Sequence, residues 1–400
     1  MPLSNQLTLL LGDLIITVWN SKYLWLPIIL AWLLYKLWMY YIHYKYIVGL
    51  NWTLLEIKLP REIHKGPQAM EMVLNMLHQS RDADNLIEKY KTGFLRPWFS
   101  LEIASFGGDI HFYIYTQKFF RNLVEAQIYA QYPDVVIEEV NDYTKNVFMT
   151  GLGETWNCWG TEFTLTEADA YPIKTYVDYG LHDLATKEEQ KNDPLTAILE
   201  YMGSIKEGEQ VWFQILIRAT TKKWKDEGKK LVEKIMKEKA AKPGEVNVGA
   251  MKLTPGERAV IEAIERDVSK LGFDVGIRAL YFSPKDTFDF VNVSSLVGVM
   301  KQFNALNLNG FKPQNTTGAK SVIGKYFNRA KKREEGLKKV KMLDAYRWRS
   351  YFYVPYERKP FVLNTEELAT IYHFPGRVAE TPTLSRIEAK RSEPPPNLPI

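Results

Sequence analysis

Residues 98–115, WFSLEIASFGGDIHFYIY, contain two runs of alternating apolar residues on either side of a glycine pair. This alternation is the period of a half-buried β-strand. The residues between the runs, Gly107, Gly108 and Asp109, are those that tight hairpin turns favour. The stretch therefore predicts two antiparallel strands joined by a short turn.

The segments on both sides of this hairpin extend the pattern. Upstream, residues 52–59 alternate as a strand, and a helix follows that begins at Pro67. Downstream, residues 119–131 have helical periodicity, and residues 135–140 have the pattern of a last strand. The order strand, helix, strand, strand, helix, strand predicts a ferredoxin-like module over residues 51–145.

A second module of the same kind is predicted over residues 155–356. Residues 210–220 and 274–283 are its middle strands, and two extra helices between them form a helical hairpin insertion over residues 221–271. Residues 348–354 are expected to supply its last strand. The predicted fold class is therefore α+β, with two tandem ferredoxin-like modules.

The stretch at residues 24–42, LWLPIILAWLLYKLWMYYI, holds 19 residues and one charge, Lys36. At about 1.5 Å per residue, a helix of this length spans roughly the 30 Å hydrocarbon core of a bilayer. Trp and Tyr residues toward its ends suit the two membrane interfaces. We predict a transmembrane helix over residues 23–47. A buried core helix is the alternative, but the stretch lacks a polar stripe.

Flanking charges predict the orientation of this helix. Only Lys22 precedes it, whereas four cationic residues lie at or after its C-terminal end: Lys36, Lys45, Lys58 and Arg61. The positive-inside rule therefore places the later domains in the cytoplasm. A lone cysteine, Cys158, agrees with this compartment because it cannot form an internal disulfide.

The N-terminal segment, residues 1–22, contains an apolar run that is too short to cross a bilayer and lacks the ends of a signal peptide. We expect it to lie in the outer interface. A second crossing that makes a helical hairpin is the alternative. The sequence thus predicts a single-pass membrane protein whose later domains are cytoplasmic; the inner (cytoplasmic) membrane is the location that the family resemblance described below implies.

Positive charge is concentrated in residues 320–349. Three acidic residues accompany eleven cationic ones, namely Lys320, Lys325, Arg329, Lys331, Lys332, Arg333, Lys338, Lys339, Lys341, Arg347 and Arg349. The segment therefore has a local net charge of +8, and the rest of the chain has −3. Interleaved aromatic residues suit nucleic acid, and clustered cations beside a membrane suit anionic lipid. A solvated loop that binds neither is the third interpretation.

The C-terminal part, residues 361–400, is distinct. A short helix is predicted after Asn364 or Thr365 as its N-cap, with Glu366 and Glu367 in its first turn. The last twenty residues are rich in proline and are expected to be extended.

No catalytic motif is recognisable, and neither a metal site nor a cofactor is predicted, because the histidines and Cys158 lack metal-ligand spacing. The best acid/base cluster combines His182 with Asp178 and Asp183. A membrane-bound enzyme with a site at these residues is the alternative to a non-enzymatic protein. A polar loop is the simpler interpretation of the cluster.

Several strings resemble an uncharacterised bacterial family of membrane-anchored domains. They are WTLLEIKLP, VEAQIYAQYPDVVIEEVNDY, FVLNTEELATIYHFPG and VAETPTLSRIEAKRSEPPPNLPI. That family occurs with type IV secretion coupling proteins and with HerA/FtsK-like DNA-translocating ATPases. In fused members, the NTEELA helix and the proline-rich strip lead into the ATPase domain. This sequence has no Walker A or Walker B segment.

The resemblance implies a non-enzymatic membrane anchor, or scaffold, for a type IV secretion-like or DNA-translocation apparatus. Its ATPase would be encoded separately, DNA is a further candidate partner, and a homo-oligomer is expected within the assembly. Docking on the ATPase is expected through residues 361–400, with these candidate contacts: Asn364, Glu366, Glu367, Leu368, Pro394, Pro395 and Pro396. A lipid- or nucleic-acid-binding scaffold is the other non-enzymatic reading.

Overall fold

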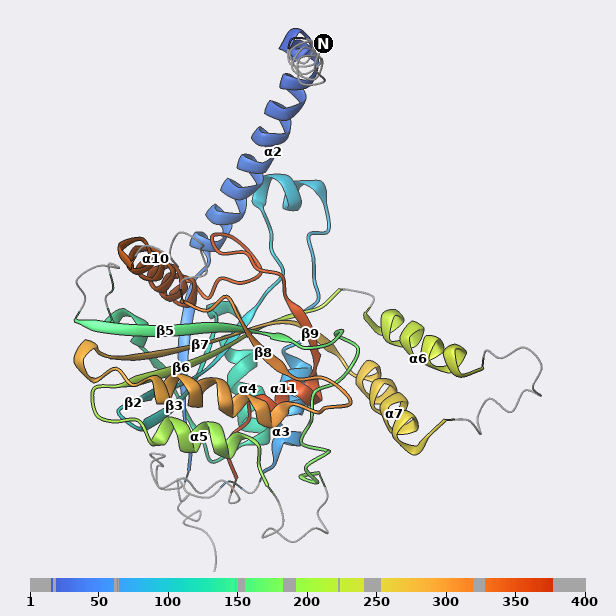
Figure 1. Ribbon diagram of the computed structural model, residues 1–400, viewed down its shortest axis with the longest axis vertical. Coiled ribbons are helices and arrows are strands. Elements are labelled where there is room, and N and C mark those ends of the chain that lie inside the picture. The colour runs from blue at the N-terminus through green and yellow to red at the C-terminus, as the bar shows by residue number, and fades with distance from the viewer. Residues whose placement is uncertain are drawn as a thin grey trace, which may run out of the picture. The chain divides into compact units, whose positions relative to one another are not determined.

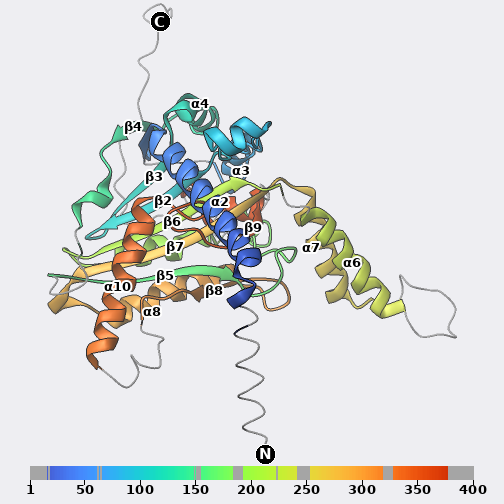
Figure 2. The same cartoon turned by 90° about the horizontal axis from the view of Figure 1, so that it is seen from above.

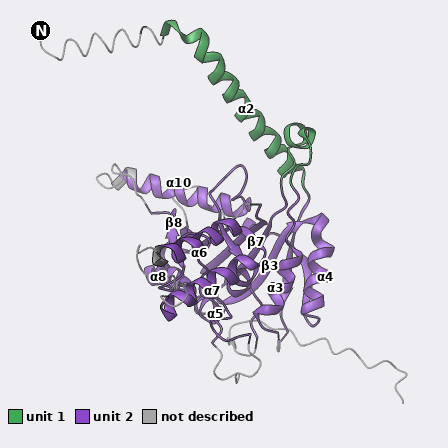
Figure 3. Cartoon of the chain, turned by 90° about the vertical axis from the view of Figure 1, so that its right-hand side faces the viewer, with its two compact units in different colours: residues 1–50, 82–95 green, residues 51–81, 96–400 purple. Residues whose placement is uncertain are grey.

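The computed structural model describes residues 16, 19–60, 63, 65–147, 149, 155–182, 192–221, 224–240, 253–318 and 328–376. It divides into two compact units (Figure 3). Unit 1 contains Met1–Leu50 and Asp82–Leu95, and unit 2 contains Asn51–Arg81 and Arg96–Ile400. Most of the predicted interfacial segment, residues 1–15, 17 and 18, lies outside the described residues.

Unit 1 is built on helix α2 (Lys22–Gly49), whose 28 residues are long and apolar enough to cross a membrane. Among the residues of α2, only Ile42 and Ile47 are buried. A π-helical turn, η1 (Glu88–Thr92), belongs to the same unit. The structure thus contains the predicted N-terminal apolar helix with its apolar surface exposed.

Unit 2 contains one antiparallel sheet (Figure 1). The strand order is β4-β1-β3-β2-β6-β7-β5-β8, and β9 also pairs with β7. The strands are β1 (Trp52–Lys58), β2 (Phe99–Phe106), β3 (Asp109–Gln117), β4 (Val136–Val140), β5 (Trp156–Leu165), β6 (Gln210–Ala219), β7 (Gly272–Pro284), β8 (Phe311–Gln314) and β9 (Phe361–Asn364). Eight residue pairs between β2 and β6 join the two halves into a continuous sheet.

Helices cover both faces of this sheet (Figures 1 and 2). One face packs on α3 (Pro67–Met76), α4 (Arg121–Gln131), α5 (Leu195–Gly203), α8 (Phe290–Gly298) and α11 (Thr365–Ile371). The opposite face packs on the C-terminal part of α10 (Asn328–Arg347). The protein is therefore a mixed α/β fold with an antiparallel sheet.

Two further helices form the predicted insertion between β6 and β7. They are α6 (Trp224–Ala240) and α7 (Pro255–Ser269), which lie side by side and project beyond the ends of the strands (Figures 1 and 2). Val232, Ile261 and Ile264 form a small buried cluster between them. The pair thus has an apolar contact of its own.

The prediction of a last strand at residues 348–354 is wrong. These residues form turns, and β8 occupies the free edge of β5 instead. Arg349 has a left-handed φ of 46°, which turns the chain away from an extended path. The Tyr351 ring packs on Gly276, where a Cβ would lie 2.4 Å from it. Residues 348–354 therefore cover a sheet face rather than extend an edge.

Candidate functional site

A row of polar residues crosses the centre of the sheet on the face that α10 covers. Glu102 of β2 lies opposite Gln214 of β6. Gln214 lies opposite Arg278 of β7, which in turn lies opposite Glu162 of β5. All four side chains are buried. Because a buried charge is costly unless it is paired, their partners determine whether the row stabilises the fold.

Glu102 is the main acceptor of this row. Its carboxylate accepts from Arg349 Nε at 3.0 Å and from the Tyr143 hydroxyl at 2.8 Å. It also accepts from Gln214 Nε2 at 3.0 Å and from Ser100 Oγ at 2.7 Å. Both carboxylate oxygens are therefore engaged.

Arg278 extends the network to the next strand. It donates to Gln214 Oε1 at 3.0 Å and to Glu162 Oε1 at 2.9 Å. The other oxygen of Glu162 accepts from Asn315 Nδ2 at 2.7 Å and from Arg358 Nε at 3.2 Å. Side chains of β2, β6, β7 and β5 are thus joined without a break.

The network balances its charges. Three acidic residues face three arginines: Glu102, Asp142 and Glu162 with Arg278, Arg349 and Arg358. Burial opposes ionisation of Asp142, but Arg349 outweighs it and lowers the pKa of that carboxyl. Burial is likewise outweighed at Glu162, whose pKa is lowered mainly by Arg278. The carboxyl groups of Asp142 and Glu162 are therefore ionised at neutral pH.

The polar row fastens the C-terminal end of α10. Tyr346 is buried there, and its hydroxyl lies 2.7 Å from that of Tyr143. Arg347 donates to the carbonyl oxygens of Thr144, at 3.1 Å, and Val147. This end of the helix is a fixed part of the sheet face.

The remaining part of α10 carries the exposed positive charge. Five of the predicted binding residues have exposed side chains: Arg329, Lys331, Lys332, Arg333 and Lys341. We call these five residues the α10 basic patch. Lys338 and Lys339 are half-buried. Lys338 Nζ donates to Glu334 Oε1 at 2.7 Å, and Lys339 Nζ donates to Asn157 Oδ1 at 2.7 Å. Lys320 and Lys325 lie outside the described residues.

For two residues, Arg349 and Arg347, the structure corrects the prediction that they bind a polyanion. Arg349 is buried between Glu102 and Asp142, so it is not available to a polyanion at the surface. Arg347 is committed to the carbonyl oxygens of Thr144 and Val147. Their place at the end of a basic helix suggested a surface, but Arg349 lies in the core and the part-buried Arg347 holds the end of α10 to the sheet face.

The helix expected to dock on an ATPase, α11, is also part of the core. Every residue of α11 is buried. Asn364 is its N-cap, because its side chain accepts from the Glu367 backbone N–H at 2.8 Å while Glu367 caps the Asn364 backbone N–H. Glu366 pairs with Lys270 at 2.8 Å, and Leu368 lies in the hydrophobic core. These four side chains are not exposed for docking, and Pro394, Pro395 and Pro396 lie outside the described residues.

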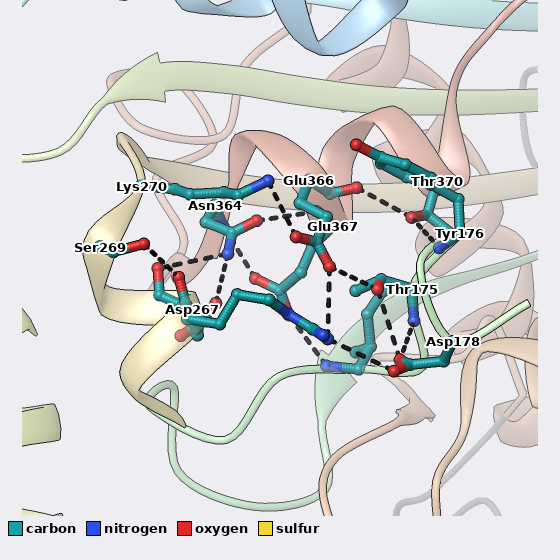
Figure 4. A network of polar contacts seen from close by, with 12 residues as sticks. Thr175, Tyr176, Asp178, Asp267, Ser269, Lys270, Asn364, Glu366, Glu367 and Thr370 are labelled. Atoms are coloured by element: carbon teal, nitrogen blue, oxygen red, sulfur yellow. Dashed lines mark hydrogen bonds and ion pairs between the residues drawn. The ribbon is translucent and has the colours of Figure 1, made fainter. Parts of the chain in front are cut away.

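Around α11 the polar contacts form a second network (Figure 4). Asn364 Nδ2 donates to Asp267 Oδ1 at 2.6 Å, and Glu367 accepts from the Ile173 backbone N–H at 2.9 Å. Burial and the charges of Glu367 and Glu366 raise the pKa of Asp267 well above its usual value. Burial also raises the pKa of Glu367, to about 7, although the Asn364 and Ile173 backbone N–H groups oppose this shift. Because these two N–H groups favour the charged form of Glu367, we assign the proton that the pair shares to Asp267.

The acid/base cluster predicted around His182 is not brought together among the described residues. Asp178 accepts from the Thr175 backbone N–H at 2.9 Å and from Arg266 at 3.3 Å, which fixes a turn. His182 is exposed, and no recorded hydrogen bond joins it to Asp178. Asp183 lies outside the described residues.

These features define a class: a mixed α/β protein whose described residues include one candidate membrane-spanning helix and a sheet with two buried polar networks. A family model matches residues 48–386, and the chain belongs to that family, a domain of unknown function designated DUF8128. No curated protein matches the chain.

Proposed function

We propose that this protein is a single-pass anchor of the inner membrane whose cytoplasmic region is a non-enzymatic scaffold. In this proposal it belongs to a type IV secretion-like or DNA-translocation apparatus and recruits a separately encoded ATPase. The observation that carries the proposal is an exposed apolar helix of membrane-spanning length in a chain whose sheet buries paired charged residues at its centre.

The strand order supports a scaffold built from two ferredoxin-like modules. In the first, α3 joins β1 to β2 and α4 joins β3 to β4, in the spatial order β4-β1-β3-β2. In the second, α5 joins β5 to β6 and α8 lies between β7 and β8, in the spatial order β8-β5-β7-β6. The same arrangement therefore occurs twice, and both are compatible with a split βαβ module.

The docking part of the proposal rests on the proline-rich tail rather than on α11. Because α11 and the residues 372–374 that follow it are buried, we propose that docking uses the later part of the tail, with Pro394, Pro395 and Pro396 as candidate contacts. Proline-rich segments bind partners as preformed extended chains. The α10 basic patch would guide a polyanionic substrate, with DNA as the candidate.

Deletion of residues 381–400 tests the recruitment. We expect the ATPase to be lost from pull-downs of the full chain in detergent, while the thermal unfolding profile stays that of the wild type. A variant with Pro394, Pro395 and Pro396 changed to alanine separates the proline contacts from tail length. Unchanged recruitment by the deletion variant would contradict the docking proposal.

A further inference from the structure

A groove in unit 1 combines apolar walls with two lysines. It has a volume of about 480 Å³ and lies between α2 and the segment Asp82–Leu95. The α2 side contributes Ile42, Lys45, Tyr46, Gly49 and Leu50, and the other side contributes Ile87, Lys91 and Thr92. Within the described part of the chain neither lysine forms an ion pair, and the Lys45 ammonium lies 5.9 Å from the centre of the Tyr41 ring. The groove thus offers two cations above an apolar floor.

Specific contacts hold the segment against α2. Trp38 Nε1 donates to the Tyr90 carbonyl oxygen at 2.8 Å, and the rings of Tyr46 and Phe94 lie 5.7 Å apart. Gly93 has a φ of 71°, and a Cβ there would lie 2.7 Å from the Ile42 carbonyl oxygen. Close packing at Gly93 therefore places the groove at a defined level of α2.

If α2 crosses the bilayer, the position of the groove along α2 corresponds to the edge of the hydrocarbon core. The 28 residues of α2 span about 42 Å, whereas the core of a bilayer is about 30 Å thick. The apolar run ends at Ile42, so in the anchor proposed above Lys45 and Gly49 would lie beyond the hydrocarbon core, at the depth of the headgroups. Leu86 and Ile87 are 72% and 67% exposed beside this end of the helix. Such exposure of adjacent apolar side chains suits insertion among acyl chains.

We propose that the segment Asp82–Leu95 is a second membrane contact, and that its groove binds the phosphate of an anionic lipid. Lys45 and Lys91 take the phosphate, and Ile42 and Ile87 border the start of an acyl chain. The proposal rests on the membrane anchor proposed above. It identifies the ligand of that anchor as the headgroup of a lipid such as phosphatidylglycerol.

Depth-dependent quenching tests the location. Single cysteines carrying an NBD fluorophore are placed at Ile87, at Leu30 of α2 and at Phe119 of unit 2. The full chain is reconstituted in vesicles of equal parts phosphatidylcholine and phosphatidylglycerol. Cys158 does not interfere, because it is fully buried and burial raises the pKa of its thiol to about 12. The vesicles contain lipids that carry a nitroxide quencher near the top of the acyl chain.

We expect quenching at positions 30 and 87 and none at position 119. Quenching at position 30 with an unquenched position 87 would overturn the second contact while leaving the anchor intact. An unquenched position 30 would overturn the anchor itself, and the lipid site with it.

Replacement of both lysines tests the ligand. The fluorophore at position 87 is quenched separately by nitroxide-labelled phosphatidylglycerol and phosphatidylcholine, and the ratio gives the lipid preference. At about fivefold for each lysine near an anionic surface, K45Q/K91Q should lower this preference by roughly 25-fold. The charge-matched variant K118Q/K285Q, in unit 2, should retain it.

Two outcomes overturn the lipid assignment. An equal preference in the wild type and K45Q/K91Q would show that the lysines do not hold the headgroup. If inorganic phosphate at equal ionic strength abolished the wild-type preference, the groove would be a site for free phosphate instead.

Discussion

Arg349 and Glu102 meet inside the protein, where both side chains are almost fully buried. Loss of Arg349 leaves the Glu102 carboxylate without its cationic partner in a region that excludes water. We therefore expect R349A to lower the free energy of unfolding by about 3–5 kcal/mol, as is usual when one member of a buried pair is removed. Denaturant unfolding of the full chain in detergent, followed by tryptophan fluorescence, measures the change.

Lys332 is the control for this prediction, because it is a cationic residue of the same segment with an exposed side chain. K332A should change the free energy of unfolding by no more than about 0.5 kcal/mol. Equal effects of R349A and K332A would mean that the buried pair does not stabilise the fold.

The proton on Asp267 predicts a pH dependence. Its pKa is raised in the folded state, so folding takes up a proton once the pH exceeds the unfolded value of 3.8. The wild type then loses about 1.4 kcal/mol of stability per pH unit, until the pH passes the folded pKa. D267N lacks this loss, and its amide can still donate to Glu367.

We expect the stability of D267N relative to the wild type to rise steadily as the pH is raised from 4 to 8. Unfolding midpoints across this range provide the measurement. Parallel pH profiles for the two proteins would show that Asp267 is already ionised in the folded state.

At the scale of elements, the C-terminal end of α10 is held to the sheet, whereas the rest of the helix carries the exposed α10 basic patch. The variant K331Q/K332Q/R333Q removes three charges of the α10 basic patch without touching the buried contacts of Tyr346 and Arg347. If the patch binds DNA, the slope of log affinity against log salt should fall by roughly 2–3, at about 0.7–0.9 per phosphate contact. Fluorescence anisotropy with labelled DNA at several salt concentrations measures it.

The matched control changes three exposed lysines elsewhere in unit 2, K118Q/K285Q/K312Q, and so alters the net charge equally. Its salt slope should equal that of the wild type. An unchanged slope in the α10 variant would remove the guide role of the patch.

Local periodicity predicted most elements of the sheet, because their apolar faces are regular. The hairpin at Gly107, the helix after Pro67 and the cap at Asn364 all lie where the sequence indicates. Local sequence patterns did not predict burial where the covering residues are distant in the sequence. Glu102, Arg278 and Glu162 have the alternation of an outward face, yet residues up to 247 positions away cover them.

One signal of that burial was present in the sequence. In β7, Arg278 is the only cationic residue of a 13-residue strand, GFDVGIRALYFSP, that is otherwise mainly apolar or small. A lone arginine in such a strand indicates a paired, buried charge. Its partners Gln214 and Glu162 lie on β6 and β5, and only the strand register identifies them.

At the scale of the whole molecule, the C-terminal elements complete the core of both halves of unit 2. β9 pairs with β7, and α11 packs against α3 with Tyr372 beside Phe112. A chain ending at residue 359 exposes this core, so we expect it to aggregate. A chain ending at Gly376 should keep the wild-type circular dichroism spectrum and a cooperative unfolding transition.

Size-exclusion chromatography in detergent compares the two truncated chains directly. A monodisperse, cooperatively unfolding chain that ends at residue 359 would show that β9 and α11 are dispensable. The region of the chain available for partners would then begin before residue 361.

We propose that this protein scaffolds a translocase at the membrane, and crosslinking in the native membrane tests this proposal. The tagged full-length chain is crosslinked in intact membranes, and the captured proteins are identified by mass spectrometry. We predict recovery of a HerA/FtsK-like or type IV coupling ATPase, with crosslinks to the tail after Gly376. Recovery of the protein alone, or with unrelated metabolic enzymes, would contradict the claim.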